Sequence, residues 1–144
     1  MEKLFQALDK QVANLSVLFT KLHHYHWYVT GPNFYALHEK FEQFYDEVNE
    51  LYDEFAERLL TIGGNPSSTL KAYLEKATIK EASGDEDVMG MVKQVLADFG
   101  VIVEELKQAI PIAQDVEDEA TADLFIGTIS SFEKHMWMLK YTLK

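Results

Sequence analysis

The sequence predicts an all-α protein, a four-helix bundle in which a long crossover connection with a short extra helix joins the second and third long helices. Three observations lead to this fold class. Hydrophobic residues make up 47% of the 144 residues, enough for one core and too many for a disordered chain. Only three prolines and seven glycines interrupt the chain. Apolar residues recur at spacings of three and four in four long segments, and we expect residues 1–144 to form one domain.

One apolar stripe defines each of the first two helices, expected at about residues 3 to 29 and 33 to 62. The turn residues Thr30-Gly31-Pro32-Asn33 separate them, and Asn33 is expected to cap the second helix. Gly63-Gly64 supplies a left-handed stop at its end. The two stripes are Leu4, Leu8, Val12, Leu15, Phe19 and Leu22, and Leu37, Phe41, Phe44, Val48, Leu51, Phe55 and Leu59.

The second half of the chain begins with a mixed segment, residues 65 to 87, that contains a short helix over about residues 70 to 77. A third long helix follows, and Pro111 is expected to bend or end it. A fourth follows the acidic residues 115 to 119. The apolar lines of these two helices are Val88, Val92, Val95, Phe99, Ile102 and Leu106, and Ala122, Phe125, Ile129, Phe132, Met136, Leu139 and Leu143. So long a link between helices two and three favours a ferritin-like bundle over simple up-down-up-down topology.

Composition excludes several functional classes. The 24 acidic and 13 basic residues give a net charge of −11, the wrong sign for a protein that packages nucleic acid through its phosphates. Cysteine is absent, which excludes disulfides, thiolate metal sites and cysteine nucleophiles. The first residues contain charges and no continuous apolar run, so neither a signal peptide nor a membrane helix is expected. A soluble, cytoplasmic protein without a membrane partner is the interpretation.

The second helix carries a second stripe, made of side chains that bind divalent metals. At 100° per residue from Leu37, the side chains of His38, Glu42, Asp53 and Glu57 lie at about 100°, 140°, 160° and 200°, away from the core line. Aromatic and apolar residues surround this stripe: Tyr35, Tyr45, Tyr52, Ala56 and Leu60. So much apolar area on an outward face indicates a surface between subunits.

Spacing decides how these ligands can meet. His38 and Glu42 are one helical turn apart, as are Asp53 and Glu57, but the two pairs are about 22 Å apart along the axis. One chain therefore cannot close a site. If two copies of the helix cross antiparallel about a two-fold axis near residues 47 and 48, each pair faces the other pair of the partner, which gives two identical sites.

His26 extends the apolar line of the first helix by one turn, next to Trp27. A lone histidine there is more often a hydrogen-bonded core residue, and most helical carboxylates simply face solvent. Together, however, two histidines and three carboxylates form a mixed nitrogen and oxygen ligand set that suits Fe(II), with Zn(II) and Mn(II) as competitors.

Three segments resemble the Dps mini-ferritins. They are His26-Trp27-Tyr28, residues 37 to 42 (LHEKFE), and residues 53 to 60 (DEFAERLL) followed by Ile62-Gly63-Gly64. Ser68-Thr69-Leu70 in the crossover and the closing residues 134 to 138 (KHMWM) extend the resemblance to nearly the whole chain. The resemblance is specific because three motifs occur in combination: the His-Trp pair, a second histidine twelve residues later and the D-x-x-x-E-R-L-L run.

The resemblance implies a four-helix subunit, a hollow homo-oligomer of twelve subunits built from dimers, and iron-oxidising sites across the dimer interfaces. The implied iron ligands are His26 and His38 of one subunit and Asp53 and Glu57 of the other. Many members have aspartate where this chain has Glu42, so direct binding, binding through water and binding of a second metal all remain open for that residue. Trp27 would trap a stray oxidising equivalent.

Carboxylate ligands stabilise Fe(III) over Fe(II), so such a site favours oxidation of bound iron. The resemblance implies hydrogen peroxide as the oxidant, storage of ferric mineral inside the shell and protection of DNA from oxidative damage. It also places Asp115, Glu119 and Asp123, which are spaced at i, i+4 and i+8, around three-fold ion channels. Acidic residues also stabilise a helix N-terminus, and this alternative explains their presence equally well. His23, His24 and His135 have no clear partners and are interpreted as surface or packing residues.

Other functions make different demands on the sequence. A bundle-centred di-iron oxidase or 24-subunit ferritin needs Glu-x-x-His motifs, which do not occur here. A non-catalytic helical scaffold remains an alternative, as does a DNA-condensing Dps. Members that condense DNA commonly have a Lys-rich tail, and this chain lacks one: the first helix is expected to start near Met1, and only Lys144 follows Leu143. We therefore expect no appreciable DNA binding at physiological salt.

Overall fold

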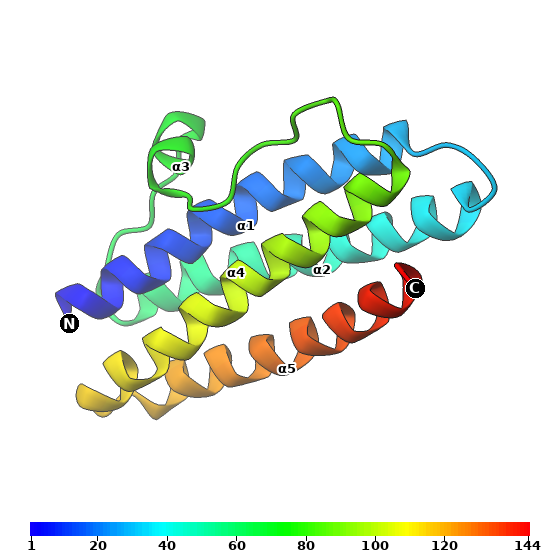
Figure 1. The fold of residues 1–144 in the computed structure, drawn as a ribbon. Coiled ribbons are helices and arrows are strands. Elements are labelled where there is room, and N and C mark those ends of the chain that lie inside the picture. The colour runs from blue at the N-terminus through cyan, green and yellow to red at the C-terminus, as the bar shows by residue number, and fades with distance from the viewer.

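The computed structural model describes residues 1–144 as five helices without strands. They are α1 (Glu2–Tyr28), α2 (Phe34–Thr61), α3 (Leu70–Lys76), α4 (Val88–Asp115) and α5 (Glu119–Thr142). Helices α1 and α2 form an antiparallel hairpin, and the crossover then runs the length of the bundle, so that α4 runs parallel to α2 and α5 parallel to α1 (Figure 1). The predicted four-helix bundle with a long crossover is confirmed.

The turns that end α1 and α2 are where the sequence predicts them. Gly31 and Gly63 have φ angles of +94° and +96°, which an L side chain rarely adopts. The amide of Gly64 donates to the carbonyl of Leu59 over 2.8 Å, which completes the left-handed stop of α2. Asn33 occupies the cap position before α2, but its side chain makes no capping hydrogen bond. The helix start was therefore predicted correctly and its capping contact was not.

The junction of α4 and α5 differs from the prediction. Pro111 lies inside α4, which continues to Asp115, so it does not end the helix. Proline removes one backbone donor, but buried Ala109 and Ala113 on either side keep this last turn packed on the core. Glu117 turns the chain with a φ of 61°, and the Asp118 side chain accepts from the amide of Thr121 to cap α5.

One apolar core fills the space between the four long helices. It contains 32 buried residues, drawn from every predicted stripe. Edge-to-face contacts between Phe44 and Phe99, and a tilted contact between Phe55 and Phe125, join α2 to α4 and α5. Five expected core residues are only half-buried, at the edges of the core: Phe19, Leu51, Val88, Met136 and Leu143. No helix combines the length and the apolar character needed to span a bilayer.

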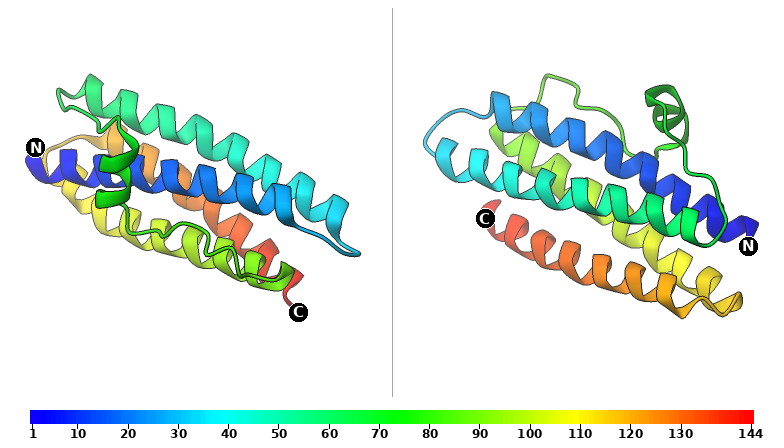
Figure 2. Two further views of the ribbon diagram at one scale, coloured as in Figure 1. Left: turned by 90° about the horizontal axis from the view of Figure 1, so that it is seen from above. Right: turned by 180° about the vertical axis from the view of Figure 1, so that it is seen from behind.

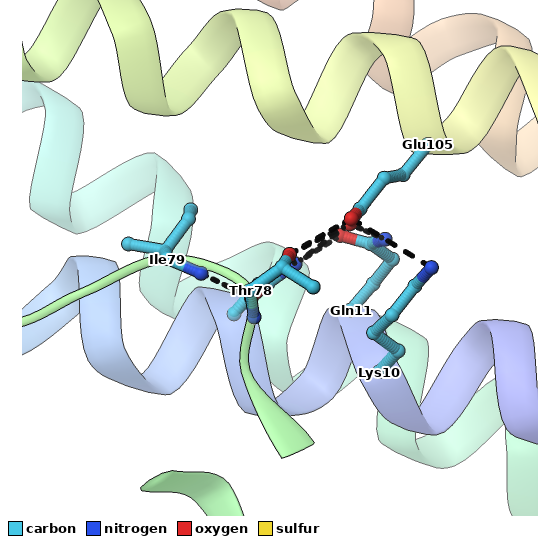
Figure 3. Close-up of polar contacts among 6 residues, drawn as sticks. Lys10, Gln11, Thr78, Ile79 and Glu105 are labelled. Carbon is cyan, nitrogen blue, oxygen red and sulfur yellow. Dashed lines mark hydrogen bonds and ion pairs between the residues drawn. The ribbon is translucent and has the colours of Figure 1, made fainter. Parts of the chain in front are cut away.

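The crossover is fastened to α1 and α4 by polar side chains, and α3 lies across the outside of α1 (Figure 2). The buried side-chain carbonyl of Asn14 accepts from the amides of Thr78 and Ile79 over 2.8 and 3.2 Å. Glu105 of α4 accepts from the amides of Gln11 and Asn14 and from the hydroxyl of Thr78 (Figure 3). The two bonds to Asn14 satisfy backbone donors of a segment that has no helix or strand of its own, and those to Glu105 tie it to α4.

Glu86 anchors the far end of the crossover. It accepts from the hydroxyl of Tyr25 over 2.6 Å and from the amide and hydroxyl of Ser83. Burial by itself would raise the pKa of Glu86, but the hydrogen bonds from Tyr25 and Ser83 outweigh it and lower the pKa to about 2. The charged carboxylate is therefore the form that holds the loop.

We expect Glu86→Gln to weaken the fold in a pH-dependent way. A depressed pKa stabilises the folded state above the ordinary value of 4.5, and the stabilisation is lost as the pH falls toward about 2. The free energy of unfolding should therefore differ between wild type and variant by about 1 kcal/mol near neutral pH, because solvent screens a partly exposed group. Denaturation curves between pH 7 and pH 2.5 check this, and a difference that does not shrink with acid would contradict it.

Candidate metal centre

Two histidines are held face to face where α1 ends and α2 begins. The rings of His26 and His38 stack with centroids 3.7 Å apart and planes 11° apart. Nδ1 of His26 donates to the carbonyl of His38, and Nδ1 of His38 donates to the carbonyl of His26, both over 2.7 Å. A carbonyl only accepts, so each Nδ1 carries the hydrogen and each neutral ring keeps an unshared electron pair on Nε2.

This arrangement is the one that metal-binding imidazoles require. A hydrogen bond from the far ring nitrogen fixes the tautomer and the direction of the ligand atom. His26 is only 7% exposed, and Phe34 stacks on the other face of His38 at 4.9 Å. The core-histidine interpretation explains the burial of His26 and its Nδ1 bond, but it leaves both Nε2 atoms without a function.

Glu42 completes the group at this end of α2. Its Oε1 lies 3.7 Å from Nε2 of His26, too far for a hydrogen bond, and its side chain is about half exposed. The carboxylate thus faces the histidines without being fixed by them. The structure therefore brings together His26, His38 and Glu42, three of the five residues that the sequence indicates.

The other two residues lie at the far end of the same helix. Asp53 and Glu57 are exposed and follow Glu42 by three to four turns, about 16 to 22 Å along the axis. No three His, Asp or Glu side chains of the single chain come close enough to hold a metal ion. The predicted ligand set is thus divided between two separate places on one face of α2.

Trp27, the residue expected to trap oxidising equivalents, is exposed beside His26. Its ring meets the edge of His23 at a centroid distance of 5.5 Å. His23 in turn stacks on Tyr45 at 3.7 Å, and Tyr45 stands edge-on to His26 at 5.3 Å. A continuous row of aromatic rings therefore runs from Trp27 to the imidazole pair.

The sequence pattern indicated no particular role for Tyr45 within this row. Its pKa is raised, first by partial burial and then by the carboxylates of Glu42 and Asp46. Its position one turn after Glu42, on the stripe side of α2, was the signal available in the sequence. His23, interpreted as a packing residue, does pack against Tyr45, and its Nδ1 donates to the carbonyl of Phe19 over 2.8 Å.

His135 has partners, contrary to the expectation. Its Nε2 lies 2.8 Å from Oε2 of Glu47, and the hydroxyl of Ser131 donates to the other oxygen of Glu47 over 2.7 Å. Burial opposes these contacts, but they outweigh it and lower the pKa of Glu47. They tie α2 to α5 on the face opposite the crossover, where Figure 2 shows the two helices side by side.

The three residues proposed for an ion channel do not form one helical row. Asp115 is the last residue of α4, whereas Glu119 and Asp123 belong to the first turns of α5. The i, i+4, i+8 series was therefore wrong for Asp115, because the turn at residues 116 to 118 interrupts it. All three carboxylates are exposed around this turn, and their assignment to a channel stays a prediction.

Comparisons with known proteins agree on one family. The family model described as a ferritin-like domain matches residues 5–144. DNA protection during starvation protein 2 of Bacillus anthracis is 50% identical over 139 residues, which cover 96% of this chain and 95% of that protein. The crystal structure of Dps from Staphylococcus aureus has a TM-score of 0.98 and 44% identity, covering 100% of this chain and 97% of that one. Dps of Listeria innocua, solved after a zinc soak, has a TM-score of 0.94 and 41% identity, covering 97% and 95%.

Proposed function

The chain belongs to the ferritin-like Dps family, and from that premise we propose that it oxidises Fe(II), with hydrogen peroxide as electron acceptor, and stores ferric mineral inside a hollow dodecamer. The observation that carries this proposal is the imidazole pair, whose Nδ1 atoms are occupied and whose Nε2 atoms are free beside Glu42. Iron is here the substrate, and the protein supplies the ligands.

Symmetry supports a site shared by two chains. The midpoint of positions 38 and 57 and the midpoint of positions 42 and 53 both fall between residues 47 and 48. A single two-fold axis at that point therefore brings His38 to Glu57 of the partner subunit and Glu42 to Asp53 of the partner subunit. The same axis does this twice, which gives two equivalent sites per dimer.

The ligand set suits the proposed reaction. Imidazole and carboxylate together bind Fe(II), and Zn(II) or Mn(II) can compete for the same donors. The three carboxylates stabilise the more highly charged Fe(III), so they favour oxidation. Two Fe(II) ions each give one electron to a peroxide molecule, and its O–O bond breaks. The two oxygen atoms take up two protons, so that two water molecules form. Pairing the electrons in this way avoids a free hydroxyl radical.

Charge favours delivery of Fe(II). The net charge of −11 attracts cations, and one side of α2 presents a row of exposed acids: Glu39, Glu50 and Glu54. We assign this row to the wall of the storage cavity and the exposed carboxylates of Asp115, Glu119 and Asp123 to its entry channels. Protection of DNA, the property named for the B. anthracis relative, would follow from consuming Fe(II) and peroxide. The acidic charge opposes phosphate binding, and we expect no gel shift at about 150 mM salt.

The expected reaction has a measurable stoichiometry. Anaerobic addition of Fe(II) and then peroxide should consume about two Fe(II) per peroxide, with growth of a ferric absorbance, because each peroxide takes two electrons. The particle mass should be about twelve times 16.6 kDa. A ratio near one Fe(II) per peroxide with free hydroxyl radical, or oxidation no faster than in buffer, would contradict the proposal and favour a scaffold.

A further inference from the structure

Two large apolar side chains stand in solvent near opposite ends of the outward face of α2. Tyr35 is 85% exposed and Leu60 is 57% exposed. On the helical wheel they lie at about 160° and 140°, within the stripe that carries the proposed ligands. Tyr35 is one turn before His38, and Leu60 is one turn after Glu57. Apolar area at such positions indicates a protein contact.

The two positions share the symmetry of the ligand pairs. The midpoint of positions 35 and 60 also falls between residues 47 and 48. An antiparallel pair of α2 helices that aligns His38 with Glu57 of the partner subunit therefore aligns Tyr35 with Leu60 of the partner subunit, once at each end. The apolar residues and the ligands thus require the same alignment independently of one another.

The residues closest to the axis fit this alignment as well. In this alignment Asp46 lies opposite Asn49 of the partner subunit, so no two acids oppose one another beside the axis. A shift of one turn in one direction sets Asp46 against Asp53 of the partner subunit, and like charges at an interface are repulsive. A shift of one turn in the other direction carries Leu60 past the first residue of the partner subunit's α2 helix, where no helical side chain opposes it.

We propose that Tyr35 of one subunit packs against Leu60 of its partner at both ends of the antiparallel α2 pair. This clasp lies one turn beyond the site, where it fixes the alignment of the two helices and closes the outer end of each iron site against bulk water. Excluding water strengthens the attraction between carboxylates and a cation. The inference rests on the shared site of the proposed function, and it names the contact that holds this site together.

Because the chain contains no cysteine, disulfide trapping tests the clasp cleanly. The variant Tyr35→Cys/Leu60→Cys, treated with diamide, should form a covalent dimer on a non-reducing gel, since a disulfide needs Cα atoms within about 7 Å. Each single variant should stay monomeric on the gel, because equivalent positions of the two helices lie about 37 Å apart. Circular dichroism checks that the helices are intact.

Tyr35→Cys/Thr61→Cys is the matched control. Thr61 is the next residue, but its side chain points about 100° away. Cross-linking of the control as fast as that of the test pair would overturn the clasp. So would the absence of cross-linking in a test variant of wild-type mass and iron oxidation rate, an outcome that leaves the proposed function intact. A wild-type protein that is monomeric and does not oxidise iron would instead refute the proposed function, and the clasp with it.

Discussion

Replacing Asp53 and Glu57 together by alanine is expected to remove the rapid phase of Fe(II) oxidation and to leave the particle assembled. Both carboxylates are exposed, so their loss opens no cavity in the core. In the shared site, however, they supply two of the three carboxylates. Loss of a residue that merely supports a metal ligand costs about 10- to 100-fold, so loss of two ligands should slow the reaction at least about 100-fold. Stopped-flow absorbance of the ferric product measures this rate.

The matched control is Glu50→Ala/Glu54→Ala. It removes the same charge from the same helix, and both residues are exposed. On the helical wheel they lie at about 220° and 260°, on the side that we assign to the cavity wall. A modest slowing in this control reports the general acidic field. If the Asp53/Glu57 variant oxidised iron as fast as the control, the assignment of these ligands would be wrong.

Asp98→Ala is expected to have the largest effect on stability. Nζ of Lys21 lies 2.8 Å from Oδ2 of Asp98, with side chains only 2% and 9% exposed, and Gln94 accepts from the same ammonium. Burial raises the pKa of Asp98, although Lys21 opposes the shift. Removing the carboxylate leaves a buried charge without its counter-charge, which destabilises a fold by about 3–5 kcal/mol. Chemical denaturation at fixed protein concentration measures the loss.

A double variant separates the charge effect from packing. In Lys21→Met/Asp98→Leu both charges are replaced by apolar groups of similar size, which is often neutral or stabilising. We expect this double variant to recover most of the stability lost in Asp98→Ala. A single variant as stable as wild type, or a double variant less stable than the single, would show that the ion pair is not what stabilises this contact between α1 and α4.

The fold was predictable because its signals are local. Apolar spacing located all four long helices, and Gly63 located the end of α2, since a positive φ is a property of one residue. The failures came where tertiary packing overrides a local rule. Pro111 does not end α4, because the buried alanines around it keep the last turn packed, and the bend expected there stays a prediction. The end of α4 at Asp115 likewise depends on how Asp118 caps the next helix.

The sequence predicted which candidate residues share a face of α2, but it did not predict their hydrogen bonds. Helical angles placed His38, Glu42, Asp53 and Glu57 on one face, because α2 is regular along its length. The reciprocal bonds between His26 and His38 depend on the path of residues 29 to 33, for which periodicity gives no information. The contact of His135 with Glu47 joins residues 88 positions apart, and no local pattern encodes such a distance.

Complementation in mixed particles tests most directly whether two chains share the site. A His26→Ala/His38→Ala chain and an Asp53→Ala/Glu57→Ala chain should each be inactive alone. When equal amounts co-assemble, half of the dimers are mixed, and one of the two sites in each mixed dimer has every native ligand. About a quarter of all sites should then oxidise iron at the wild-type rate. Mixed particles that contain both chains by mass spectrometry, yet stay as inactive as either parent, would contradict a site built between two subunits.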